Sequence, residues 1–140
     1  MAVNQSTFRI PATTEGRFFD YWLELLKPFT GLTNKESAVL AAFLRKRHSL
    51  AKVIKDATLL DKVLMGDESR RAIRESLQLK LPHFQVIMSN LRKQGIIKDN
   101  KIVPLLIPNL TEDSGVYKLV FAFDMQDDSK SNATLKESTQ

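Results

Sequence analysis

Residues 69–97 read SRRAIRESLQLKLPHFQVIMSNLRKQGII, and the fold prediction starts from them. In the second half of this stretch, large apolar residues recur at the i, i+3, i+4, i+7 spacing of one helical face: Phe84, Ile87, Met88 and Leu91. In the first half, Ile73 and Leu77 form a shorter apolar face, and Leu79 follows it. The two patterns predict a pair of amphipathic helices joined by a tight connection.

The residues at the ends of the second helix support this prediction. Pro82 suits a first helical turn, where its missing N–H costs nothing. Gly95 stands where a helix C-terminus favours a left-handed residue. Ile96 and Ile97 are β-branched and favour a strand directly afterwards. The stretch therefore predicts a helix-turn-helix with a second helix over 82–94, followed by a β wing.

The order of these residues resembles the core pattern of winged helix-turn-helix DNA-binding domains. The resemblance rests on Leu77-x-Leu79-Lys80, Phe84, Met88, Leu91 and Gly95-Ile96-Ile97. It covers residues 33–123 and is similar to bacterial MarR-type regulators and to phage or plasmid replication initiators. The chain departs from the pattern at Gln78, where such proteins often have Gly. It also has Lys80-Leu81-Pro82 where the recognition helix usually begins with Ser or Thr.

Composition narrows the function classes. A chain of 140 residues without cysteine predicts one domain with tails and excludes a disulfide framework or a thiolate site. No signal peptide or membrane-spanning apolar run is apparent, so we expect a cytoplasmic protein without membrane contact. His48 and His83 lack ligand-spaced partners, and no phosphate loop, HExxH or GxSxG occurs. We therefore expect no enzyme activity, no metal and no cofactor.

Positive charge is concentrated around the helix-turn-helix. The net charge is +5, but residues 45–101 carry 14 Lys or Arg against 6 Asp or Glu, a local excess of eight. A basic segment that coincides with this motif is typical of phosphate binding. The alternative is that these residues only solvate helices. If a helix ends at Arg45-Lys46-Arg47, these residues could instead interact favourably with the negative C-terminal end of its dipole.

Before the motif we predict an extended arm over 1–14 and a helix over 15–29. One face of that helix would carry Phe18, Trp22, Leu25, Leu26 and Phe29. Phe19 and Tyr21 lie off this face, so the helix either forms a homodimer contact or packs within the domain. Thr33 to Glu36 is a capping box. It should begin a helix to about Arg47 that buries Val39, Leu40, Phe43 and Leu44, with one or two short helices in 49–66.

After the motif, the sequence predicts a three-stranded antiparallel meander. Its strands would be Ile96–Lys98, Lys101–Leu106 and Val116–Asp124, with a turn at Asp99-Asn100 and a wing loop at either 99–101 or 109–115. Phe84, Met88 and Leu91 would pack against Leu40, Phe43 and Phe121. Residues 125–140 are polar, and we expect disorder there. The predicted fold is mainly α with a small antiparallel sheet: a winged helix-turn-helix domain over 15–124 with an extra N-terminal helix.

The predicted function is binding of double-stranded DNA by a transcriptional regulator or a replication-type protein. Gln85 and His83 would meet base edges, while basic residues of the first helix and the wing would meet phosphates. The candidate DNA-binding residues are Arg70, Arg71, Arg74, Lys80, His83, Gln85, Ser89, Arg92, Lys93, Lys98 and Lys101. The alternative is a winged helix used only for protein–protein contacts or assembly. Leu81, Pro82 and Val86, near the presumed reading surface, favour that alternative.

Overall fold

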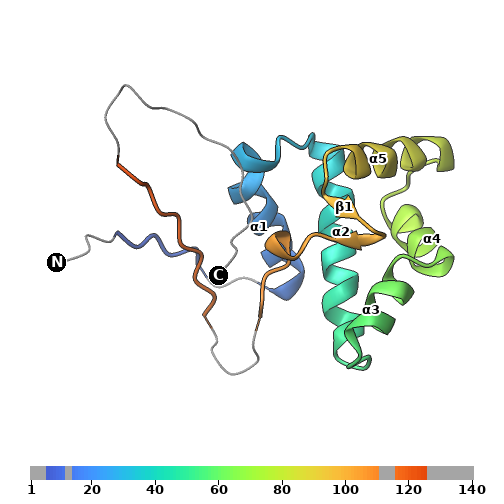
Figure 1. Ribbon diagram of the computed structural model, residues 1–140, viewed down its shortest axis with the longest axis horizontal. Coiled ribbons are helices and arrows are strands. Elements are labelled where there is room, and N and C mark those ends of the chain that lie inside the picture. Colours follow the sequence, from blue (N-terminus) through green and yellow to red (C-terminus); the bar gives the residue numbers. More distant parts are fainter. Residues whose placement is uncertain (1–5, 12–13, 111–115, 126–140) are drawn as a thin grey trace.

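The computed structural model describes residues 6–11, 14–110 and 116–125. Within them, five helices precede a two-stranded antiparallel sheet and a 3-10 turn (Figure 1). The elements are α1 (Glu15–Thr30), α2 (Asn34–Ala51), α3 (Ala57–Leu64), α4 (Asp67–Ser76), α5 (Leu81–Lys93), β1 (Ile97–Lys98), β2 (Lys101–Ile102) and η1 (Pro104–Leu106). The prediction of a mainly helical fold with a small antiparallel sheet is confirmed. Except for Met125, the predicted tail 125–140 lies outside the described residues, as do 1–5 and 12–13 of the arm and 111–115 of the second candidate wing loop.

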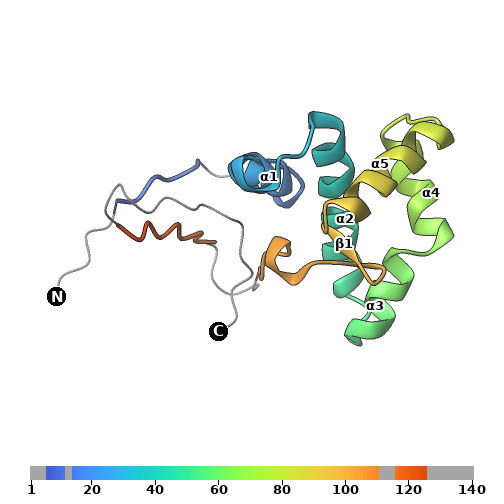
Figure 2. The same cartoon turned by 45° about the horizontal axis from the view of Figure 1, so that its top comes forward.

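Helix α2 is the centre of the molecule. Its predicted apolar stripe is buried, and α1 packs on one side of it while α3, α4 and α5 pack on the other (Figures 1 and 2). The predicted capping box is confirmed: the Glu36 N–H donates to Thr33 Oγ1 at 3.2 Å, and the Thr33 N–H donates to Glu36 Oε1 at 3.0 Å. The helix continues to Ala51, four residues beyond the predicted Arg47, because Leu44 and then Leu50 keep contact with the core.

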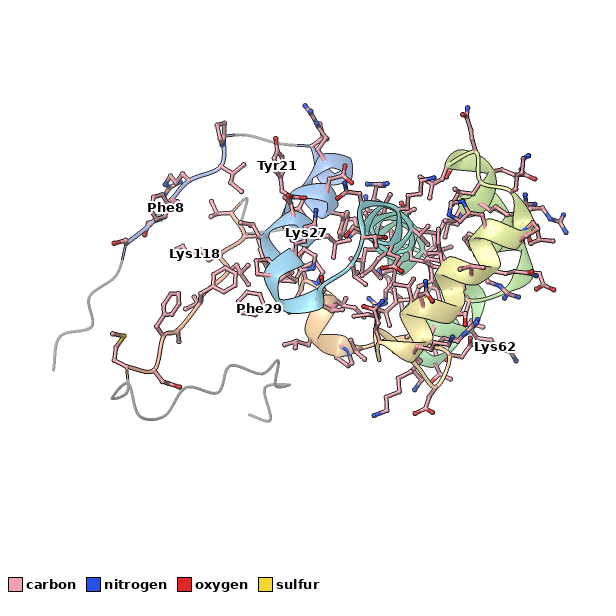
Figure 3. All side chains as sticks on the ribbon, turned by 90° about the horizontal axis from the view of Figure 1, so that it is seen from above. Phe8, Tyr21, Lys27, Phe29, Lys62 and Lys118 are labelled. Carbon is pink, nitrogen blue, oxygen red and sulfur yellow. The ribbon has the colours of Figure 1, made fainter. Side chains whose placement is uncertain are left out.

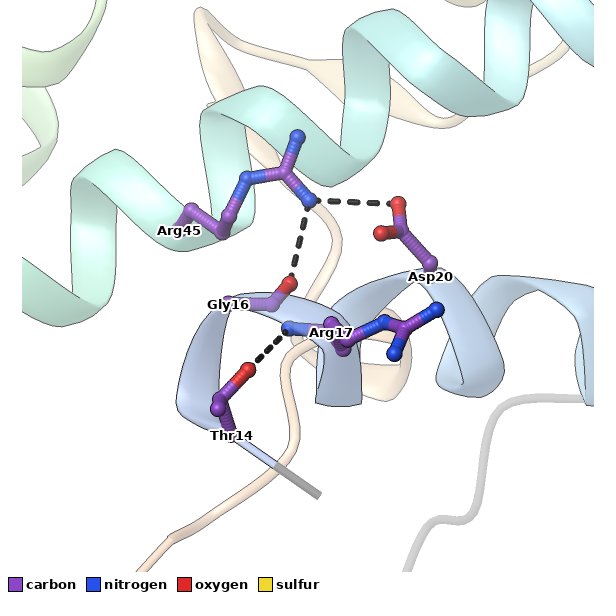
Figure 4. A network of polar contacts seen from close by, with 5 residues as sticks. All are labelled: Thr14, Gly16, Arg17, Asp20 and Arg45. Atoms are coloured by element: carbon purple, nitrogen blue, oxygen red, sulfur yellow. Dashed lines mark hydrogen bonds and ion pairs between the residues drawn. The ribbon is translucent and has the colours of Figure 1, made fainter.

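The buried face of α1 differs from the predicted one. Phe19, Trp22 and Leu23 are buried, whereas Leu25 and Phe29 of the predicted face are exposed and do not pack within the domain. The Arg45 guanidinium of α2 explains the rotation, because Nη1 donates to the Gly16 carbonyl at 3.2 Å and pairs with the Asp20 carboxylate at 3.1 Å (Figure 4). Together with the aromatic contacts, these bonds turn the 19/22/23 side of α1 toward α2.

Helix α3 confirms the prediction of one or two short helices within residues 49–66, and α4 follows it directly. Residues 49–66 contain one separate helix, α3, whose first turn is capped by Asp56 accepting from the Thr58 N–H at 3.2 Å. Helix α4 then starts at Asp67. Ser69 is buried and donates its hydroxyl hydrogen bond to the Val63 carbonyl at 2.8 Å, which joins the start of α4 to the end of α3.

The predicted three-stranded meander is wrong. The second strand stops at Ile102, because Pro104 starts a 3-10 turn, and residues 116–125 form no strand. Trp22 Nε1 donates to the Leu106 carbonyl at 2.9 Å, which brings the chain back to α1 after the hairpin. Phe121 accordingly stacks on Phe29 of α1, with ring centroids 5.4 Å apart, rather than on α5.

Candidate nucleic-acid interface

Helix α5 separates an apolar face from a polar one, as predicted. Phe84, Ile87, Met88 and Leu91 are buried, and Phe84 stacks on Phe43 of α2 with ring centroids 6.5 Å apart. The other side of the helix carries the candidate reading residues. His83, Gln85, Arg92 and Lys93 are exposed, and Ser89 is partly buried. The helix is therefore anchored by one side and presents its polar side to solvent.

The connection between α4 and α5 contains the departure noted at Gln78. Gln78 has φ of 55°, in the left-handed region that favours glycine. The connection closes with two backbone bonds typical of a helix end, from the Leu79 N–H to the Arg74 carbonyl at 3.1 Å and from the Gln78 N–H to the Glu75 carbonyl at 3.0 Å. The tight turn is made despite the side chain, at a conformational cost.

Gly95 sets the direction of the hairpin. Its φ is 75°, as predicted for a helix C-terminus, and the following Ile96 N–H donates to the Leu91 carbonyl at 2.9 Å. The predicted turn at Asp99-Asn100 is also confirmed. Both residues have positive φ, 53° and 59°, which matches the two-residue turn that suits the twist of an antiparallel hairpin.

The hairpin places two lysines opposite each other. Lys98 of β1 pairs with Lys101 of β2, and both side chains are exposed. Like charges directly opposite in an antiparallel pair are destabilising. Neither lysine forms an ion pair with another described residue, and the single charge of Asp99 in the turn offsets only one of the two. The hairpin tip therefore has the electrostatics of a site for an anion.

The three α4 arginines are not equivalent. Arg70 forms an ion pair with Asp67, one turn earlier on the same helix. Arg74 Nη1 donates to the Leu79 carbonyl at 3.3 Å, which supports the turn before α5. Arg71 is exposed, and within the described part of the chain it has no ion pair. Of the three, Arg71 is the one available to a phosphate without losing an internal contact.

Two arginines of the basic run in α2 are committed to internal contacts. Arg45 holds α1, as described above, and Arg47 Nε lies 3.7 Å from the Asp61 carboxylate of α3. The run lies inside α2 rather than at its end, so the helix-dipole explanation for it was wrong. Within the helix-turn-helix and the hairpin, the exposed basic residues without an ion pair to another described residue are Arg71, Lys80, Arg92, Lys93, Lys98 and Lys101.

A buried polar contact positions α5, and the sequence interpretation missed it. Asn90 Nδ2 on α5 donates to Glu36 Oε2 at the start of α2, at 3.1 Å. The Thr33 backbone N–H is the main cause that lowers the pKa of Glu36 below 4.5; hydrogen bonds from Asn90, Gln94 and the Thr33 side chain assist, while burial opposes. The carboxylate thus remains charged and ties the two helices together. The available signal was Asn90 standing beside Leu91 at the edge of the apolar stripe.

The described residues offer little for other site chemistries. Across 6–11, 14–110 and 116–125, no three His, Asp or Glu side chains come together as metal ligands would. His83 lies exposed on α5, while His48 packs near the Phe19 ring, at 5.8 Å between centroids. In the described part of the chain, no helix has both the length and the apolar character needed to cross a membrane.

Comparison with known proteins gave no relative. No family model matches the chain, and neither a curated protein sequence nor a solved structure matches it.

Proposed function

We propose that this protein binds double-stranded DNA through α5 and the β1–β2 hairpin, as a winged helix-turn-helix domain. Helix α5 would enter the major groove, and the hairpin would contact the adjacent backbone. Six exposed basic residues support this proposal, because they lie on α4, α5, the turn between them and the hairpin. Such a protein would serve as a transcriptional regulator or a replication-type protein.

The opposed lysines of the hairpin carry the proposal. Lys98 and Lys101 repel each other across the two strands, and the sheet they belong to is only two residues long on each side. A sequence selected for stability alone would avoid this pair. A phosphate between the two ammonium groups would turn the repulsion into two charge-assisted hydrogen bonds.

Contacts along α5 would divide between positioning and reading. Arg92 and Lys93 occupy the last turn, where they also favour the helix dipole and would reach phosphates. Gln85 is exposed near the start of the helix and could pair bidentately with adenine. Val86 beside it is 56% exposed and could contact a thymine methyl group.

The test is titration of a labelled random-sequence duplex at several salt concentrations. We expect binding whose log K falls linearly with log salt, and a slope shallower by about 0.9 for Lys98→Ala and again for Lys101→Ala. Arg17→Ala removes an exposed charge from α1, on the other side of α2, and should leave the slope unchanged. No binding, or binding without salt dependence, would overturn the proposal.

A protein-interaction module is the second candidate, and one observation favours it. Leu81 and Val86 are 51% and 56% exposed on the same surface as the basic residues, with Pro82 exposed between them. Apolar residues at the centre of a surface with a charged rim are typical of protein interfaces. The salt titration separates the two candidates, because a protein-interaction module has no counterions to release from DNA.

A further inference from the structure

Residues 116–125 are an extended segment with a strand sequence, and within the described chain residues 117–125 pair with no strand. They read VYKLVFAFDM, an alternation of β-branched and aromatic residues that favours strands strongly. The chain runs extended here (Figures 1 and 2), yet residues 117–125 make no backbone hydrogen bond to another described segment. A row of unpaired N–H and C=O groups of this kind is a template for pairing with another chain.

One face of the segment is held on α1. Tyr117 contacts the rings of Phe18 and Trp22, with centroids 5.4 Å and 5.6 Å away, and Phe121 stacks on Phe29. Since side chains alternate along an extended chain, Leu119 belongs to the same face, and it packs against the core. These odd-numbered contacts fix the segment beside the helix and leave its outer face and backbone edge open.

The apolar surface is too large for the segment to cover by itself. Val120, Phe123 and Met125 are 71%, 86% and 90% exposed. The neighbouring α1 adds a second exposed stripe at i, i+4, i+8: Tyr21, Leu25 and Phe29. Figure 3 shows Tyr21 and Phe29 on the helix and Lys118 on the segment nearby. So many exposed large apolar side chains on one segment and its neighbouring helix are typical of an interface.

The sequence of the segment is complementary to itself. In an antiparallel pair of two copies related by a two-fold axis at Phe121, Lys118 of one copy lies opposite Asp124 of the other, and Val120 lies opposite Ala122. The two-fold axis repeats each of these pairs, so the interface has two Lys118–Asp124 pairs on its outer face. A one-residue slip would destroy both charge pairs and place apolar side chains on opposite faces.

We propose that this protein forms a homodimer by antiparallel pairing of residues 117–125 with the same residues of a second copy. The exposed stripe of α1 packs against the partner beside the two-stranded ribbon. The homodimer contact that the sequence predicts for the 15–29 helix would therefore be shared between α1 and the extended segment. The proposal does not depend on DNA binding, because α4 and α5 lie on the other side of α2 from α1 (Figure 1).

A charge swap tests the register. In sedimentation experiments on the full chain, Lys118→Asp and Asp124→Lys should each weaken dimerisation about tenfold, since each puts like charges opposite at both pairs. The double variant Lys118→Asp/Asp124→Lys should return to within about threefold of the original affinity. An equimolar mixture of the two single variants should form heterodimers. Lys62→Asp, an exposed charge change on α3, should have no effect.

A disulfide experiment tests the same register without altering charge. The chain has no cysteine, so Val120→Cys and Ala122→Cys can be introduced singly at exposed positions. Under mild oxidation, a mixture of the two variants should form the cross-linked heterodimer much faster than either forms a homodimer. Circular dichroism confirms that each variant is folded. A monomer at all concentrations, a dimer insensitive to both charge reversals, or a double variant that stays as weak as the single ones would overturn the proposal.

Discussion

The carboxylate of Glu36 accepts a hydrogen bond from the side-chain amide of Asn90, 54 residues later in the chain. One oxygen of that carboxylate closes the capping box with Thr33, and the other receives the Asn90 bond. The N-terminus of α2 is thereby fixed to the C-terminal half of α5. Since α5 is the proposed recognition helix, this contact sets the angle at which its polar face leaves the core.

Acid should weaken this contact in a defined direction. The native state lowers the pKa of Glu36 below 4.5, so native Glu36 binds protons less readily than in the unfolded chain. Its contribution to stability is therefore complete above pH 4.5 and is lost as the pH falls through the lower native pKa. Glu36→Gln should reduce the free energy of unfolding at neutral pH by about 1–3 kcal/mol, because it removes hydrogen bonds to a charged group. Urea unfolding at neutral pH and in steps below pH 4.5 measures both effects.

A double-mutant cycle with Asn90, the hydrogen-bond partner of Glu36, tests the same contact. Asn90→Ala should also destabilise, and the double variant should lose less than the two single losses combined, with a coupling of about 0.5–3 kcal/mol. Strict additivity of the two substitutions would contradict the direct bond. So would an unchanged acid dependence in Glu36→Gln.

The sequence predicted the parts of the fold that rest on local patterns. The stripes of α2 and α5, the capping box, Gly95 and the Asp99-Asn100 turn each depend on a few adjacent residues with one dominant conformation. The buried face of α1 could not be predicted from a local pattern, because both sides of that helix are apolar. Its rotation depends on Arg45, a residue of another helix, bonding to Gly16 and Asp20.

The left-handed Gln78 provides a stability test. A non-glycine residue at φ of 55° costs about 1–2 kcal/mol of conformational energy. Glycine removes this cost, but its greater conformational entropy in the unfolded chain offsets part of the gain. Gln78→Gly should therefore raise the free energy of unfolding by about 0.5–1 kcal/mol. Thermal and urea unfolding measure the change.

Gln94 is the control for that substitution. Both residues lie just after the end of a helix. The φ of Gln94 is −83°, however, where glycine has no conformational advantage over glutamine. Gln94→Gly should be destabilising, because it also removes the side-chain hydrogen bond of Gln94 to Glu36. Equal gains at both positions would show that the gain does not come from relief of the left-handed conformation at Gln78.

Strand pairing was the other feature that local patterns could not determine. Val116–Asp124 has the best strand sequence in the chain, and a strand needs a partner that its own residues do not specify. The hydrogen bond from Trp22 to Leu106 leads the chain to α1, so the segment meets aromatic rings instead of β2. The candidate site showed the same limit: eight of its eleven residues are exposed, but Arg70, Arg74 and Ser89 are partly buried, and the internal contacts of the two arginines were not foreseen.

Burial of the α5 stripe predicts a large loss at its centre. Leu91 is fully buried between α2 and the hairpin, so Leu91→Ala should lower the free energy of unfolding by about 2–5 kcal/mol through lost burial and a residual cavity. Leu81→Ala, on the same helix but half-exposed, should cost under about 1 kcal/mol. A pair of equal, small losses would mean that α5 does not pack as described.

The two kinds of contact in the proposed interface should respond differently to substitution. Arg71 is exposed on α4 and would meet a phosphate, so Arg71→Ala should weaken binding to every duplex alike and make the salt slope shallower by about 0.9. Gln85 would meet a base edge, so Gln85→Ala should remove about 1–3 kcal/mol of discrimination at one position and leave the slope unchanged. His83→Ala should behave like Gln85→Ala. Selection of preferred sites from random duplexes, followed by salt titration of each variant, measures both quantities.

Arg74→Ala is not a clean phosphate probe, because its guanidinium also holds the Leu79 carbonyl. A change in base preference with Arg71→Ala, or in salt slope with Gln85→Ala, would contradict the assigned docking of α5.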